Sequence, residues 1–203
     1  MLVSAIEGHR LWAPSYDEAP NPLLALEDRM LALAERGLVV DIACGTGRRT
    51  SRLRAQGANV FGVDLCEAML RRAASKPGIA GRVVQADAAC LPILGDVADL
   101  TLCTIAVGYF PSLDGAFTEM ARITRPGGRV VVSDLHPDGV ARGWTRSFRA
   151  DGQRYEMRPC GHSVDAILGA ADTAGLHLES QQDAALGESG EMPVLWIACW
   201  SKP

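Results

Sequence analysis

Residues 39–50 read VVDIACGTGRRT, an apolar run that leads into Gly45-Thr46-Gly47 and then into a segment compatible with a helix. Glycines permit a tight turn and let a ligand approach the backbone closely, and the start of the following helix offers free N–H groups. A strand, a glycine turn and a helix in this order are typical of an α/β protein. The turn alone is weak evidence for any one ligand, because nucleotide-binding and purely structural turns share it.

Two details of this segment favour a zwitterionic ligand over a phosphorylated one. The dinucleotide-binding fingerprint has a third glycine, whereas this chain continues with Arg48, Arg49 and Thr50. In addition, Asp41 lies near the end of the apolar run, four residues before Gly45. A carboxylate at that point repels a pyrophosphate and attracts an ammonium group.

From residue 38 onward, short runs rich in Val, Ile and Leu alternate with longer helix-compatible segments, which predicts βαβ units on a mostly parallel sheet. The first five runs are apolar throughout, as expected for strands covered by helices on both faces, so the pattern predicts a three-layer α/β sandwich. The predicted strands cover residues 38–43, 59–63, 82–86, 98–104, 129–134, 176–181 and 193–200. Apolar spacing and punctuation by Ser, Gly and Pro predict helices over residues 48–56, 66–75, 113–124 and 163–174.

Two further acidic residues follow the second and third predicted strands. Asp64 ends the run VFGVDL, where a carboxylate can accept hydrogen bonds from both hydroxyls of a ribose. The alternative role of Asp64 is to cap the next helix, and the two roles are compatible. Asp87 follows the third run and is placed to accept a hydrogen bond from an exocyclic amine such as that of adenine, with a simple turn residue as the alternative.

Four motifs, in order and at matching spacing, resemble those of the class I S-adenosylmethionine-dependent methyltransferases of the small single-domain type that acts on small molecules. The motifs are VVDIACGTG, VFGVDLCEAML, ADAACLPI and RITRPGGRVVVSD. The resemblance covers about residues 36–135 and extends more loosely to the end of the chain. It implies a Rossmann-like sheet of seven strands in the order 3-2-1-4-5-7-6 with the last strand antiparallel, and the apolar run MPVLWIACW near the end fits that last strand.

The same resemblance implies S-adenosylmethionine as the cofactor and S-adenosylhomocysteine as its product. It implies that Asp41, Ala43 and Gly45 hold the methionine end of the cofactor, at the turn that Gly47 completes. The other implied contacts are Asp64 with the ribose, Leu65 with the adenine ring, Asp87 and Ala88 with the adenine amine, and Thr104 and Ile105 beside the sulfonium.

The chain departs from the family pattern at two positions. Ala43 stands where the family usually has glycine, and Gly108 stands where many relatives carry a histidine, so a general base is not inherited from the motif. Methyl transfer from a sulfonium is an in-line displacement that depends mainly on alignment and on exclusion of water. Where the acceptor needs a base, the candidate catalytic residues are His136, which directly follows the fifth strand, Tyr109, and His162 from the late segment.

Two segments outside the motifs are expected to lie near the substrate. Residues 1–36 read as helical pieces broken by prolines, and this leader either forms a lid over the carboxyl edge of the sheet or covers a helix face. Within it, Tyr16 and Trp12 either contact the sulfonium through their aromatic faces or simply pack. Residues 137–161 contain two alternating runs around Asp151-Gly152, which predicts a hairpin insertion at the substrate edge. The hairpin segment carries side chains that either clamp a flat or anionic substrate or stay solvated: Trp144, Arg146, Phe148, Arg149, Arg154, Tyr155 and Arg158.

Composition indicates which classes of protein the chain does not resemble. A chain of 203 residues with 48% hydrophobic and 22% charged residues is typical of one globular domain, here residues 1–203. A formal net charge of −4 argues against nucleic-acid binding. The longest apolar run is too short to cross a bilayer, and Glu7 interrupts the region where a signal peptide is apolar. The six cysteines show neither a CxxC motif nor zinc-finger spacing, so we expect reduced cysteines, no metal site and a cytoplasmic protein without membrane contact.

The sequence therefore predicts an enzyme that transfers the methyl group of S-adenosylmethionine to an oxygen, nitrogen or carbon atom of a small-molecule metabolite. Two alternatives remain open: an oxidoreductase that uses a nicotinamide dinucleotide on a similar sheet, and a cofactor-binding protein that no longer transfers methyl groups. We expect a small-molecule substrate and a monomer or homodimer.

Overall fold

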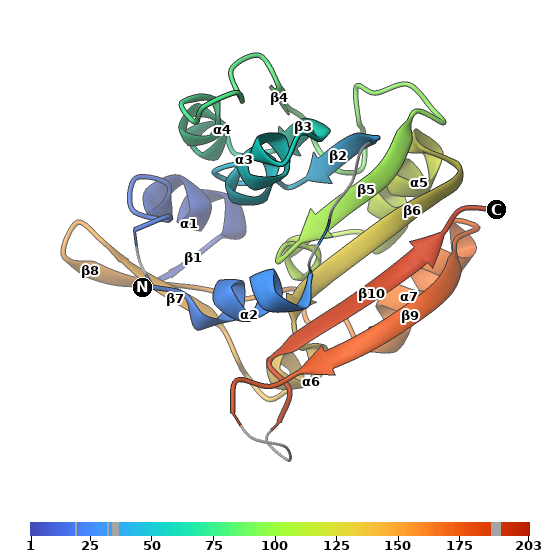
Figure 1. Cartoon of the computed structure of the whole chain (residues 1–203). Coiled ribbons are helices and arrows are strands. Elements are labelled where there is room, and N and C mark those ends of the chain that lie inside the picture. Colours follow the sequence, from blue (N-terminus) through green and yellow to red (C-terminus); the bar gives the residue numbers. More distant parts are fainter. Residues whose placement is uncertain (19, 32, 34–36, 188–191) are drawn as a thin grey trace.

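A seven-stranded sheet forms the centre of the molecule (Figure 1). The computed structural model describes residues 1–18, 20–31, 33, 37–187 and 192–203. The strands lie in the order β4-β3-β2-β5-β6-β10-β9. Their bounds are β2 Leu38–Ile42, β3 Asn59–Asp64, β4 Val83–Gln85, β5 Ala98–Thr104, β6 Thr124–Leu135, β9 His177–Ala184 and β10 Leu195–Ser201.

The predicted fold class is confirmed. Counted along the chain within this sheet, the observed order is 3-2-1-4-5-7-6. Strands β2 to β6 are parallel to their neighbours, and β10 runs antiparallel to both β6 and β9. Strand β6 begins at Thr124 rather than at residue 129, because Thr124 pairs with Ala98 of β5 ahead of the Arg-Pro-Gly-Gly turn.

Helices cover both faces of the sheet and complete the three layers. On one face, α5 (Leu113–Ile123) and α7 (Val164–Thr173) pack on alternate strand residues such as Val40 and Ile42. On the other face, α3 (Arg48–Ala55) packs through Leu53 on Val39 and its neighbours. Alternation of this kind lets a wholly apolar strand serve two cores, which is why the central runs show no polar period. Helix α4 (Glu67–Ala74) contacts β3 and β4 at the edge of the sheet.

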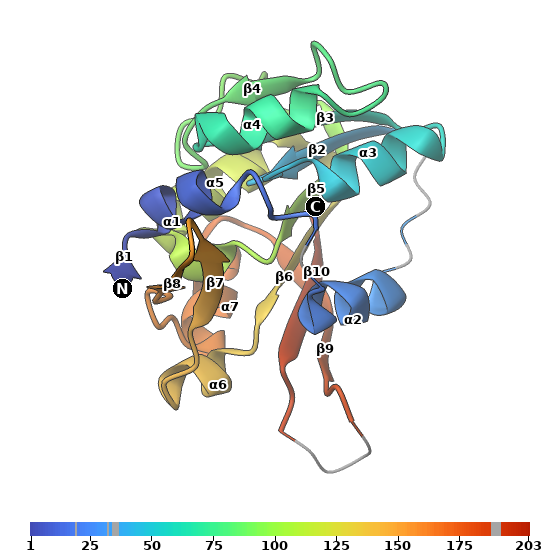
Figure 2. The ribbon, with the colours of Figure 1, turned by 90° about the vertical axis from the view of Figure 1, so that its left-hand side faces the viewer.

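The leader and the segment after β6 join in a second, three-stranded sheet in the order β1-β8-β7. Strand β1 (Leu2–Val3) pairs in parallel with β8 (Gln153–Met157), which forms an antiparallel hairpin with β7 (Arg146–Ala150). Asp151 and Gly152 at the hairpin turn both have positive φ, 50° and 74°, as a type I′ turn requires. Figure 2 shows the hairpin beside α1 (Ala5–Trp12), which contacts both of its strands.

The other elements of the leader and the loops are short. Helix α2 (Pro22–Met30) is one of the helical pieces expected in the leader, and residues 19, 32 and 34–36 of the leader lie outside the described residues. A single 3-10 turn, η1 (Val107–Tyr109), follows β5, and α6 (Pro137–Ala141) follows β6. Within the described ranges, no helix is both long and apolar enough to cross a bilayer.

Candidate active site

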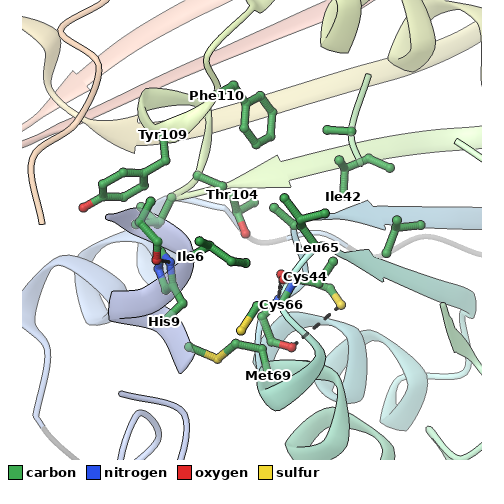
Figure 3. Close-up of a pocket in the computed structure, with 18 of the residues that line it drawn as sticks. Ile6, His9, Ile42, Cys44, Leu65, Cys66, Met69, Thr104, Tyr109 and Phe110 are labelled. Carbon is green, nitrogen blue, oxygen red and sulfur yellow. Dashed lines mark hydrogen bonds between the residues drawn. The ribbon is translucent and has the colours of Figure 1, made fainter. Parts of the chain in front are cut away.

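A cavity of about 310 Å³ lies at the carboxyl ends of β2, β3, β4 and β5, with α1 across its mouth (Figure 3). This volume is at the lower end of the usual range for small-molecule sites, roughly 300–1,000 Å³. The strand-end segments in its wall are Ile42–Thr46, Val63–Cys66, Ala86–Ala89 and Thr104–Ala106. The wall also includes Ala5, Ile6 and His9 of α1, Tyr16 of the leader, and Tyr109 and Phe110 after β5.

The glycine turn after β2 leaves room for a ligand. Gly45 has a φ of 57° and its amide N donates to Asp64 Oδ2 at 2.7 Å. A Cβ built on Gly45 would meet no atom within 4 Å, so the backbone there faces open space. Ala43 also lines the cavity, with a φ of 53°. A left-handed alanine is strained where glycine is not, which explains why glycine is usual at this position.

Gly47 serves the packing of two helices instead of the cavity wall. It precedes α3 with a φ of 70°, and it does not line the cavity. A Cβ on Gly47 would lie 2.9 Å from the Cβ of Ala73 in α4. Gly47 therefore lets α3 and α4 approach each other, and its predicted contribution to the ligand site stays a prediction.

Asp64 links the turns after β2 and β3 and lines the cavity. Its two carboxylate oxygens accept hydrogen bonds from the amides of Gly45 and Cys66, both at 2.7 Å. Burial raises the pKa of Asp64, while the backbone donors, Cys66 first, act in the opposite direction. Each carboxylate oxygen can accept a second hydrogen bond, so this fixed side chain can still receive the hydroxyls of a ribose.

Asp41 lies behind the turn rather than in the cavity wall. Its side chain is buried, with only 1% of its surface exposed, and Oδ2 accepts a 2.6 Å hydrogen bond from Thr50 Oγ1. Its Oδ1 is buried and has no partner among the described residues. Burial raises the pKa of Asp41 to about 6. The carboxylate thus lies one layer below the turn, and its predicted contact with an ammonium group stays a prediction.

The adenine-side residues lie at the rim of the cavity. Leu65 is 51% exposed and lines the wall, as does Ala88. Asp87 lines it too, and its Oδ1 accepts a 2.9 Å hydrogen bond from Ala89 N, so it also shapes its own turn. An apolar side chain and a carboxylate side by side at a rim suit a flat, apolar ring that carries an amino group.

The residues predicted beside the sulfonium are brought together in the structure. Thr104, Ile105 and Tyr16 all line the cavity. Ile105 has a φ of 54°, a rare conformation for a β-branched residue, and its amide donates to Ser133 O at 2.7 Å. Strain of about 1–3 kcal/mol at such a residue persists only where the surroundings hold it, and here it lies at the wall of the site.

The three candidate catalytic residues differ in position. His162 is not part of the cavity wall, and its Nε2 lies 2.7 Å from Phe110 O. Tyr109 lines the cavity; its hydroxyl is buried without a partner in the described part of the chain, and burial raises its pKa, so it acts as a donor rather than a base. His136 lies outside the cavity wall. It caps α6, with Nδ1 accepting from Asp138 N at 3.2 Å and Nε2 lying 3.3 Å from Asp183 Oδ1. In the structure His136 therefore serves as a helix cap, and its role as a base stays a prediction.

Two further polar residues lie in or near the cavity wall: His9 was not named from the sequence, and Arg146 was named only as a member of the hairpin group. His9 of α1 lies in the wall, with its ring 5.5 Å from that of Tyr109 in an edge-on arrangement (Figure 3). Its Nδ1 donates to Ala5 O at 2.8 Å, and burial together with the nearby Arg146 charge lowers its pKa to about 4. Arg146, one of seven aromatic and basic residues noted in the hairpin segment, is itself buried. Neither position carries a local signal of burial, because the leader and the hairpin bury them through tertiary contacts.

Comparison with known proteins agrees with this geometry. Residues 40–132 match the family described as a methyltransferase domain. The malonyl-[acyl-carrier protein] O-methyltransferase of Pectobacterium atrosepticum is 34% identical over 178 residues, which cover 86% of this chain and 69% of that protein. The demethylmenaquinone methyltransferase of Thermus thermophilus is 39% identical over 106 residues, 49% of this chain and 47% of that protein. The chain therefore belongs to the class I S-adenosylmethionine-dependent methyltransferases.

Solved structures show the same fold. An S-adenosylmethionine-dependent methyltransferase from Mesorhizobium loti superposes with a TM-score of 0.71 at 23% identity, covering 90% of this chain and 98% of that one. The open backbone at Gly45, the exposed Leu65 and the fixed Asp64 carboxylate all fit an adenosyl ligand with an amino-acid tail. The cofactor is S-adenosylmethionine, and the nicotinamide-dependent oxidoreductase is set aside.

Proposed function

We propose that this enzyme transfers the methyl group of S-adenosylmethionine to an oxygen, nitrogen or carbon atom of a small acceptor that binds under α1 and beside the β7–β8 hairpin. The observation that supports this most strongly is the composition of the cavity wall. Strand ends that carry the cofactor motifs form one side, and α1 with Tyr16 and Tyr109 forms the other. In this proposal the cofactor lies against the first side and the acceptor against the second, with water excluded from between them.

Each side of the cavity has a distinct role in this proposal. Asp64 accepts the ribose hydroxyls, Leu65 packs on the adenine ring, and the backbone at Ala43 and Gly45 leaves room for the methionine end. The buried charge of Asp41 lies behind that turn and favours a cationic group in front of it. When bound, S-adenosylmethionine supplies an electrophilic methyl group on a positively charged sulfur. Thr104, Ile105 and Tyr16 border the place where the acceptor meets it.

Transfer to oxygen is the first reaction to test. The relatives in Pectobacterium atrosepticum and Yersinia pestis are both named malonyl-[acyl-carrier protein] O-methyltransferases, with 34% and 30% identity to this chain. The chain spans 69% of the first protein and 54% of the second. Because part of each relative has no counterpart in this chain, we use their acceptor only to choose the probes.

The proposal is tested by binding and by turnover. Calorimetry with S-adenosylhomocysteine is expected to give one site per chain. Asp64→Asn should weaken that site by about 10-fold or more, because a ribose hydroxyl loses a charged acceptor. The matched control is Asp172→Asn, which changes an exposed carboxylate on α7. Release of S-adenosylhomocysteine from S-adenosylmethionine with a panel of oxygen, nitrogen and carbon acceptors then measures transfer. A folded protein that binds neither cofactor form would contradict the proposal.

A further inference from the structure

His9 lies in the cavity wall on the side where the proposed function places the acceptor. It belongs to α1, and its ring centre is 5.5 Å from that of Tyr109 in an edge-on arrangement. Figure 3 shows the two side chains together on the α1 side of the cavity, across from Leu65 and Cys44. Among the described residues of this wall, His9 is the one histidine. The acceptor side of the cavity therefore contains an imidazole.

The hydrogen bond of this imidazole defines its tautomer. Nδ1 lies 2.8 Å from the carbonyl oxygen of Ala5. A carbonyl oxygen only accepts, so Nδ1 carries the proton, and Nε2 of a neutral ring keeps a free lone pair. In the part of the chain that the structure describes, Nε2 has no hydrogen-bond partner. Burial, and after it the charge of Arg146, lowers the pKa of His9 to about 4, so the ring is neutral at pH 7.

Several other titratable side chains of the wall are less suited to accept a proton from a ligand. Burial raises the pKa of Tyr109, so its phenol stays protonated. Burial also raises the pKa of the thiols of Cys44 and Cys66. The carboxylates of Asp64 and Asp87 lie on the cofactor side, where both already accept hydrogen bonds from backbone amides. His9 is therefore the candidate base on the acceptor side.

The turn after β5 supplies no base of its own. Gly108 has no side chain, and a Cβ built on it would lie 3.1 Å from Asp134 Oδ2 and 3.5 Å from the Cβ of Pro159. Neither of these two neighbours lines the cavity, so a side chain at position 108 would start toward residues outside the wall. The next residue, Tyr109, keeps its proton. His9 instead brings an imidazole against this turn from the leader.

A weak base in this place suits an acceptor that has a hydroxyl group. A hydroxyl oxygen that gains a methyl group becomes an oxonium, which is a far stronger acid than an imidazolium and gives up its proton even to a base with a pKa of about 4. An alkylamine that gains a methyl group keeps its proton, since an ordinary ammonium has a pKa of about 10. The neutral ring also causes no repulsion of a sulfonium beside it.

Resting on the proposed function, we infer that the acceptor carries a neutral hydroxyl group and that Nε2 of His9 accepts first its hydrogen bond and then its proton. The hydroxyl oxygen attacks the methyl carbon, and a C–O bond forms as the C–S bond breaks, with the electron pair going to sulfur. The proton on oxygen passes to Nε2, so the products are a methyl ether, S-adenosylhomocysteine and an imidazolium. The positive charge thus moves from sulfur to His9, which returns the proton to water after the products leave.

The first test does not depend on the identity of the acceptor. Resonances of the imidazole nitrogens are recorded at pH 7 for isotopically labelled protein saturated with S-adenosylhomocysteine, and His9 is assigned as the signal that is missing in His9→Asn. We expect a protonated Nδ1 and an unprotonated Nε2. A proton on Nε2 would contradict the inference, because that nitrogen could not then accept a hydrogen bond.

The second test compares hydroxyl compounds with their own methyl ethers. Protein saturated with S-adenosylhomocysteine is titrated with phenol, cresol, benzyl alcohol and hexanol, and with the methyl ether of each. We expect at least one hydroxyl compound to bind about 3-fold or more tightly than its ether, since the ether has no proton to donate to Nε2. A compound selected in this way is then incubated with S-adenosylmethionine, and mass spectrometry is expected to detect its methyl ether.

Two variants of His9 separate a role in the reaction from a structural one. His9→Asn retains an amide that can donate to Ala5 O but removes Nε2. The hydroxyl compound and its ether should then bind about equally, and turnover should fall about 100-fold or more. In His9→Ala, imidazole added to the buffer should restore part of the turnover. A side chain that only packed would not be replaced in this way.

The matched control is His177→Ala, which removes an exposed histidine from β9 at the far edge of the sheet. This variant should keep the turnover of the wild type, with or without imidazole. All three variants should bind S-adenosylhomocysteine as tightly as the wild type does.

Other results would overturn the inference. A wild-type protein that binds S-adenosylhomocysteine but prefers none of the hydroxyl compounds, or methylates none of them, has no such acceptor site. Unchanged turnover in His9→Asn removes His9 from the reaction. A loss of turnover in His9→Ala that imidazole does not restore assigns His9 a structural role. No binding of S-adenosylhomocysteine to wild-type protein would defeat the proposed function itself, and this inference with it.

Discussion

Ala43 has a φ of 53° at the wall of the cofactor site, and it stands where the family usually has glycine. A left-handed alanine costs roughly 1 kcal/mol more than a left-handed glycine. We therefore predict that Ala43→Gly raises the free energy of unfolding in urea by about 0.5–1 kcal/mol. Ala55→Gly, at an exposed end of α3, should lower it by about the same amount. Equal destabilisation by both changes would contradict the argument from φ.

The buried carboxylate of Asp41 makes stability depend on pH. Burial raises its pKa from 3.8 to about 6 in the folded protein. Between these values the folded state binds more protons than the unfolded state, so stability falls as pH rises through this window. Asp41→Asn should remove that part of the fall, because an amide does not ionise and its oxygen can still accept from Thr50. The Tm of the variant minus the Tm of the wild type is expected to be more positive at pH 7.5 than at pH 4.5. A difference that does not change with pH would contradict this.

The sequence predicted correctly that residues on loops at strand ends line the cavity. It could not predict the position of a side chain within a strand, because the direction of that side chain decides whether it reaches the cavity. Asp64 and Leu65 follow β3 and line the cavity as expected. Asp41 is still inside β2, paired with Gly62, and its side chain turns toward Thr50 of α3. A sequence gives the position of an acid along a strand but not the layer that receives it. Arg146 was named from the sequence as one of seven hairpin residues, but its burial could not be predicted, since its partners Tyr16 and Ile105 lie far away in the sequence.

At the level of helices and strands, the buried carboxylate of Glu27 holds α2 against the rest of the domain. Glu27 is fully buried, and its carboxylate accepts hydrogen bonds from Arg48, from Arg49 at 2.8 Å and from Ser133. We predict that Glu27→Ala lowers the free energy of unfolding by about 3–5 kcal/mol, because it removes the fully buried carboxylate and leaves the buried Arg49 with only the longer ion pair to Asp28 at 3.2 Å. Urea denaturation measures this change.

The control for Glu27 is an exposed pair. Glu67 and Arg71 form an ion pair at 2.7 Å on α4, with side chains 62% and 76% exposed. Glu67→Ala should change the free energy of unfolding by less than about 0.5 kcal/mol. A comparable loss in both variants would mean that burial is not what makes the Glu27 contacts valuable.

The helices and strands of the main sheet followed from apolar runs and from Gly, Ser and Pro at their ends. Ser163, for example, caps α7 by accepting from Ala166 N at 3.1 Å. The three-stranded sheet could not be predicted in full from such patterns, because of β1. Strand β1 has two residues and pairs with β8, so it has neither an alternating pattern nor a local partner in the sequence. Strand β1 forms only through tertiary contact between the start of the chain and the β7–β8 hairpin.

At the level of the whole molecule, α1 and the β7–β8 hairpin pack together in one cluster, and α1 also lines the cavity at the carboxyl edge of the sheet. Trp12 of α1 stacks on Phe148 of β7 with ring centres 4.8 Å apart and planes 6° from parallel. Phe148 in turn stacks on Tyr155 of β8. Because β1 also pairs with β8, movement of α1 has to carry the hairpin with it or break this cluster.

Hydrogen exchange with and without S-adenosylhomocysteine shows whether the strand ends under α1 hold the cofactor. We predict slower exchange at residues 43–46, 64–66 and 86–89, and in α1 and the hairpin together, with β9 at the far edge of the sheet unchanged. Saturating ligand that protects none of the three strand-end segments, or protects a different face of the molecule, would contradict it.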